Sequence, residues 1–87
     1  MVKWSRTGEG WAVNLDGTDA AESFSLPRLE LRAGAGGWRT ACLLADGTVR
    51  EGGASAAGDL RGAKADAVSR ARGLLAPDEA AALAPLL

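Results

Sequence analysis

GGWRTACLLADGTVREGG, residues 36–53, predicts two β-strands joined by a tight turn. Residues 38–45, WRTACLLA, are the most strand-like run in the chain. Asp46-Gly47 suits the turn because both central positions of a type I′ turn need positive φ. A two-residue turn here sets the strand pairing, which is Ala45 with Thr48, Leu44 with Val49 and Leu43 with Arg50.

Three segments before this hairpin also have strand character, namely 2–4, 11–15 and 24–32. Alternation is clear in 11–15, but in 24–32 its phase changes at Pro27. Proline cannot donate to a strand ladder, so Pro27 marks an edge, a bulge or a strand start. A four-residue loop at 34–37 predicts the pairs Ala33 with Trp38, Arg32 with Arg39, Leu31 with Thr40 and Leu29 with Cys42.

Two helices follow the strands. Asp59 is a suitable N-cap, and apolar residues recur at helical spacing from Leu60 to Leu75, so we predict a helix over 59–75. Pro77 opens a shorter helix over 77–84, before Pro85. The fold class is therefore α+β: an antiparallel β-meander of four to five strands within about 2–51, with one main C-terminal helix and a short second helix packed on one face. Residues 1–87 form a single domain.

The predicted pairing sorts the side chains onto two faces. The face that meets the helix holds Leu29, Leu31, Trp38, Thr40, Cys42, Leu44 and Val49. The opposite face holds four arginines, one glutamate and one leucine. We predict partner-binding residues on this basic face, because arginine makes bidentate contacts to carboxylates and phosphates: Arg28, Arg32, Arg39, Leu43 and Arg50. A plain solvated sheet face is the alternative.

Composition limits the cellular compartment and the kinds of partner expected for the protein. Ten Lys and Arg against eleven Asp and Glu give a net charge of −1, so no global field attracts nucleic acid or lipid. A single cysteine, Cys42, excludes an intrachain disulfide and fits a reducing, cytoplasmic compartment. The sequence also lacks an apolar run long enough to span a membrane and the apolar core of a signal peptide.

The residue types argue against an enzyme. The chain has no histidine, so Cys42 lacks its usual base partner. The glycines at 34–37 lack the Lys and Ser/Thr of a phosphate loop, and the acids of 16–22 lack calcium-loop spacing. No zinc ligand set is present. We therefore expect no catalytic residue, cofactor or metal. Trp4 and Trp11 are either core residues or stacking platforms for bases.

A family resemblance suggests a function. Trp4 and Trp11 flank a glycine turn, Asp46-Gly47 forms a hairpin, and LRGAKADAV (60–68) opens the helix after the sheet. In these features the chain resembles small meander-plus-helix proteins of bacteriophages and mobile elements, including some anti-CRISPR inhibitors. The resemblance implies a non-enzymatic protein-binding inhibitor that blocks a bacterial nuclease or defence complex.

Two other partners fit the sequence. One is nucleic acid, bound on the arginine-rich sheet face. The other is a second copy of the chain, against which the uncharged end at 82–87 could pack instead of packing on its own core.

Overall fold

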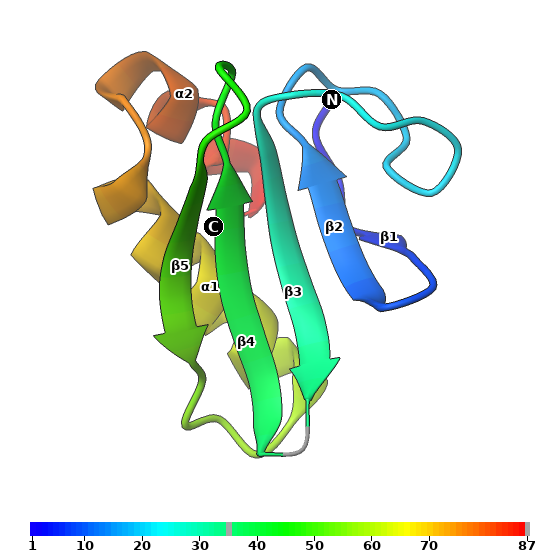
Figure 1. Cartoon of the computed structure of the whole chain (residues 1–87), viewed down its shortest axis with the longest axis vertical. Helices are drawn as coiled ribbons and strands as arrows, with labels where there is room; N and C mark the ends of the chain where they lie inside the picture. The colour runs from blue at the N-terminus through cyan, green and yellow to red at the C-terminus, as the bar shows by residue number, and fades with distance from the viewer. Residues whose placement is uncertain (35, 87) are drawn as a thin grey trace.

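A five-stranded antiparallel sheet and two helices make up the fold in the computed structural model, which describes residues 1–34 and 36–86. The strands lie in chain order, and the helices cover one face of the sheet (Figure 1). This confirms the predicted meander with a main C-terminal helix and a short second one. The elements are β1 (Ser5–Arg6), β2 (Gly10–Asn14), β3 (Arg28–Gly34), β4 (Gly37–Leu43), β5 (Val49–Ala54), α1 (Leu60–Leu74), α2 (Pro77–Ala81) and a 3₁₀ turn (Ala84–Leu86).

Several helix and strand boundaries differ from the predicted ones. The first strand is 5–6 rather than 2–4, and β3 begins directly after Pro27, at the strand start that a proline allows. Asp59 caps α1 as predicted, since its carboxylate accepts a hydrogen bond from the Gly62 amide at 3.1 Å. The second helix ends at Ala81 instead of 84.

The predicted register between β3 and β4 is confirmed. Leu29 pairs with Cys42, Leu31 with Thr40, Arg32 with Arg39 and Ala33 with Trp38. The pairing continues to Gly34 and Gly37, so the strands run further into the predicted loop than expected. Ala35, in the same loop, lies outside the described residues.

The predicted register between β4 and β5 is wrong by one residue. Leu43 pairs with Val49 and Cys42 with Arg50. The Leu44 amide donates to the Thr48 carbonyl at 2.8 Å, and Gly47 has a φ of 88°. The loop therefore has three residues, Ala45 to Gly47, with glycine in the left-handed position, rather than the two of a type I′ turn.

The core lies between the sheet and α1. In one cluster Val13, Leu29 and Cys42 pack against Val68 and Ala71; in a second, Leu31 packs against Ala63 and Ala67. The alanines of α1 are small and let the helix approach the sheet closely. The predicted helix stripe is confirmed, and on the same helix Arg70 forms an ion pair with Asp66 at 3.1 Å.

The sheet ends at β5, and α1 contacts this edge strand. Arg70 donates a hydrogen bond to the Gly52 carbonyl at 2.5 Å. The register of β5 shifts beside Thr40 and Ala41, which leaves Gly52 as an extra residue in the strand. The Arg70 guanidinium therefore binds the irregular part of the edge strand β5.

Candidate binding surfaces

The face of the sheet that points away from α1, called the outer face below, carries side chains in three rows across the strands. The pairings of β2 to β5 give an upper row of Asn14, Arg28, Leu43 and Val49, a middle row of Ala12, Glu30, Ala41 and Glu51, and a lower row of Gly10, Arg32, Arg39 and Ala54. The register thus groups the side chains into chemically different bands.

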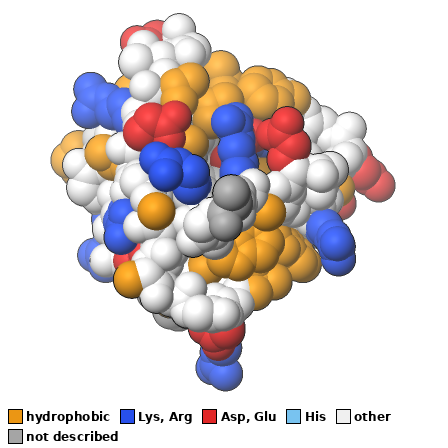
Figure 2. Space-filling view, turned by 60° about the horizontal axis from the view of Figure 1, so that its bottom comes forward, with side chains coloured by type: hydrophobic (Ala, Val, Ile, Leu, Met, Phe, Trp, Pro, Cys, Tyr) orange, Lys and Arg blue, Asp and Glu red, His pale blue; other side chains and the backbone are white. Residues whose placement is uncertain are grey.

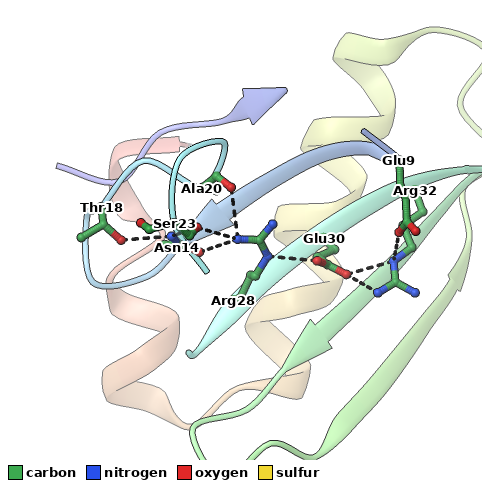
Figure 3. A network of polar contacts seen from close by, with 8 residues as sticks. All are labelled: Glu9, Asn14, Thr18, Ala20, Ser23, Arg28, Glu30 and Arg32. Carbon is green, nitrogen blue, oxygen red and sulfur yellow. Dashed lines mark hydrogen bonds and ion pairs between the residues drawn. The ribbon is translucent and has the colours of Figure 1, made fainter. Parts of the chain in front are cut away.

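Arg28 lies on the outer face as predicted, but it is not exposed. It is 5% accessible and donates to the Asn14 side chain at 2.9 Å, to the Glu30 carboxylate at 2.9 Å and to the carbonyl oxygens of Ala20 and Ser23. Its guanidinium also lies 4.9 Å from the Phe24 ring centroid. Figure 3 shows this network joining β3 to the loop before it. Its Nε and Nη1 groups are engaged within the fold, and a side chain that is 5% accessible offers a partner little surface.

Arg50 lies on the opposite face from the one predicted. Its pairing with buried Cys42 turns its side chain toward the helices. There it lines a hollow of about 280 Å³ together with Leu74 and Glu79. The same register difference moves Val49 in the opposite direction, although we expected it to be buried under the helix. Val49 is 51% exposed on the outer face.

Arg32 and Arg39 are exposed and pair across β3 and β4, as predicted. Arg32 forms ion pairs with Glu30, through a short contact, and with Glu9 at 3.6 Å. The Glu30 hydrogen bond raises the pKa of Arg32. Within residues 1–34 and 36–86, Arg39 has no ion pair, so it is the free cation of the lower row.

An apolar row of two exposed side chains and one half-buried side chain lies on the outer face, and the sequence indicated only one of its members. Leu43 is half-buried, Val49 is 51% exposed and Phe24 is 64% exposed. Leu43 pairs with both Val49 and Arg28, and Phe24 stacks on Arg28, so the three side chains are linked. The sequence signal that could have identified Phe24 was the presence of a large aromatic residue among polar loop residues.

The three tryptophans lie together with α1 rather than on the outer face. Trp4, Trp11 and Trp38 are partly buried against the cluster of Leu31 and the α1 alanines. The Lys64 ammonium lies 3.6 Å from the Trp11 ring centroid and 5.9 Å from that of Trp4. Partial burial lowers the pKa of Lys64. The tryptophans therefore cover the core and also leave ring surface accessible.

Two hollows lie beside these rings. One of about 170 Å³ is lined by Trp11, Trp38, Ala33 and the segment 6–10. A larger one, of about 380 Å³, is lined by Trp4, Arg61, Lys64, Ala65 and Leu86. Figure 2 views the molecule from the side of the β3–β4 turn and shows hydrophobic side chains gathered there, with both basic and acidic side chains around them.

The remaining chemistry is limited in the part of the chain that the structure describes. No group of three or more His, Cys, Asp or Glu side chains is placed to hold a metal ion there. Cys42 is buried, and the desolvation of its thiol raises its pKa to about 11. In the same residues, neither helix is long and apolar enough to cross a membrane.

Comparison with known proteins found no matching protein-family model, no similar curated protein and no similar solved structure. Any function therefore has to be argued from the surfaces themselves.

Proposed function

We propose that the chain is a small non-enzymatic protein-binding module and that its outer face makes the contact. The observation that supports this most is the apolar group of exposed Phe24, exposed Val49 and half-buried Leu43, with the unpaired cation Arg39 on the same face. Apolar side chains that gather on one face, rather than lying singly, are typical of interaction sites. Such rows bind by removing apolar surface from water.

The charges of the outer face suggest the chemistry of the partner. Arg39 can bind a carboxylate with two parallel hydrogen bonds, and arginine is enriched among residues that dominate binding energy. Glu51 is also exposed and lies in the row above. The partner surface should therefore present apolar side chains next to a carboxylate, with a cation opposite Glu51.

Nucleic acid is a weaker candidate for this face. Its affinity for a protein comes largely from cationic contacts to phosphates. Of the four arginines assigned to the face, Arg28 is buried and engaged, and Arg50 lies on the other side. Arg32 is held by two carboxylates. One free arginine beside two glutamates does not form a cationic surface that could bind successive phosphates.

The test is a quantitative capture experiment with matched variants. Immobilised wild type, Arg39→Glu, Val49→Glu and Arg72→Glu proteins are exposed to a nuclease-treated bacterial lysate. Arg72 is exposed in the last turn of α1, away from the outer face, and its variant makes the same charge change as Arg39→Glu. A partner of the outer face is captured by the wild type and by Arg72→Glu, and about tenfold less by the two outer-face variants. Equal capture by all four proteins contradicts the proposal.

The resemblance to anti-CRISPR inhibitors suggests which partner to test first. We propose a bacterial nuclease complex, blocked by occupation of its surface. Purified protein added in stoichiometric amount should suppress target cleavage, and Arg39→Glu should restore it. Full cleavage at a tenfold molar excess of wild-type protein, an order-of-magnitude guide from typical interface affinities, would rule out that complex.

A further inference from the structure

A contact between Trp11 and Lys64 connects the linings of the two hollows at the tryptophans. Trp11 lines the smaller hollow and Lys64 lines the larger one, and the Lys64 ammonium lies 3.6 Å from the Trp11 ring centroid. A single cation on an indole therefore separates two spaces that are each bordered by a further tryptophan. Trp38 borders the smaller space and Trp4 the larger. We call these residues, with the hollows between them, the aromatic end.

Cations without ion-pair partners surround the aromatic end. Arg6 lines the smaller hollow, and Arg61 and Lys64 line the larger one. Over residues 1–34 and 36–86, none of these three side chains lies within 4.0 Å of a carboxylate. Two acids lie nearby: Glu9 lines the smaller hollow and pairs with Arg32 at 3.6 Å, and Asp59 caps α1. The linings of the two hollows thus carry three cations and one carboxylate, on a protein whose net charge is −1.

We propose that the aromatic end binds single-stranded nucleic acid. Two spaces with indole walls, separated by a cation, match the alternation of planar base, phosphate and planar base along a strand. Bases would stack on the tryptophans, and the phosphate between them would contact Lys64 and Arg61. Stacking on aromatic rings along a positively charged groove is the general mode by which proteins bind single strands without reading sequence.

Single strands fit this site better than a duplex or an acidic peptide. In a duplex the faces of the bases are stacked on each other and cannot reach an indole. An acidic peptide would satisfy the cations but would leave the ring surfaces without planar partners. The proposed site is also separate from the outer face, since Trp11 pairs with Leu31, whose side chain lies in the core under α1.

Fluorescence anisotropy with a 5′-labelled oligodeoxythymidine of about 12 nucleotides tests the proposal, since single-strand sites span roughly 4–16 nucleotides. Two to three phosphate contacts predict that affinity falls about 7- to 18-fold between about 50 and 200 mM salt. An unlabelled strand should quench tryptophan fluorescence in parallel. Absence of binding at about 50 mM salt, or equal affinity for a duplex of the same length, would overturn the proposal.

Matched variants locate the site. Arg61→Gln and Lys64→Gln each remove one cation and should lower the salt dependence by about 0.7 in log–log slope. Arg72→Gln, on the same helix, and Arg39→Gln, on the outer face, make the same charge change away from the hollows and should bind like the wild type. Arg61 is exposed, so its variant folds even if substitutions at the tryptophans do not. If the two control variants weaken binding as much as Arg61→Gln, the aromatic end is not the site.

Discussion

Arg28 shows how a single buried charge organises one side of the sheet. A guanidinium stays ionised in proteins, so a buried arginine needs acceptors for its donors and a nearby counter-charge. Here Glu30 supplies the counter-charge, while Asn14 and two loop carbonyls supply the acceptors. Arg28 thereby fixes the loop that carries Phe24, one of the three apolar residues of the proposed contact surface.

Replacing Arg28 with methionine should destabilise the protein strongly. Glu30 and Asn14 would keep buried polar atoms without their partner, and loss of one member of a buried pair costs about 3 kcal/mol. The free energy of unfolding, measured by urea denaturation, should fall by this amount. Arg39→Met, which removes an exposed arginine without an ion pair, should change it by less than about 0.5 kcal/mol. Equal losses in the two variants would contradict the structural role of Arg28.

Asp16 makes stability depend on pH in the acidic range. Hydrogen bonds donated by Ser25 and Thr18 lower its pKa from 3.8 to about 2. Because the folded-state pKa is the lower one, the stabilisation is complete above about 3.8 and is lost as pH falls through about 2. Asp16→Asn cannot titrate, so the gap in urea midpoint between wild type and variant should narrow from pH of about 5 to about 2. A gap of constant size would show that Asp16 is not the group responsible.

At the scale of the elements, loop geometry decided which predictions were right. The β3–β4 register was predictable because glycines bound a short connection, and the pairing that this connection implies places Leu29, Leu31 and Cys42 on one face. The β4–β5 register was not, because Asp46-Gly47 occurs both in two-residue turns and in three-residue loops with a left-handed glycine. That one-residue difference exchanged Val49 and Arg50 between the faces.

The candidate site was only partly predictable for a related reason. Arg32, Arg39 and Leu43 follow from alternation along two neighbouring strands. The burial of Arg28 does not, because it depends on how residues 16–27 fold back across the sheet. No periodicity in the sequence predicts the contact between this loop and Arg28. The same contact places Phe24 beside the strands.

The start of β2 requires glycine at position 10. Its φ is 156°, and a Cβ atom there would collide with the Leu31 carbonyl oxygen of the neighbouring strand. Gly10→Ala should therefore lower the free energy of unfolding by more than about 2 kcal/mol. Gly8→Ala is the matched control, since a Cβ atom at position 8 meets nothing within 4 Å. Thermal denaturation followed by circular dichroism measures both, and a wild-type melting temperature for Gly10→Ala would contradict this close approach.

For the molecule as a whole, Cys42 is a reporter of unfolding. It lies in the main core cluster with 0% exposure, and burial raises the pKa of its thiol to about 11. Since the thiolate is the reactive form, the native protein should react with a thiol reagent at pH of about 8 only when the core opens. The alkylation rate in increasing urea should follow the unfolded fraction measured by tryptophan fluorescence. Rapid labelling of the folded protein would contradict the placement of Cys42 in the core.

The hydrogen bond from Arg70 to the Gly52 carbonyl also affects the tendency of the protein to aggregate through its sheet edge. An outermost strand with free amides and carbonyls can recruit further strands and grow into a fibril. In β5 one carbonyl is already taken by a guanidinium, and the extra residue breaks the regular spacing that an incoming strand would need. The contact that joins the helix to the sheet thus also occupies part of the sheet edge, and we expect it to disfavour the addition of further strands along that edge.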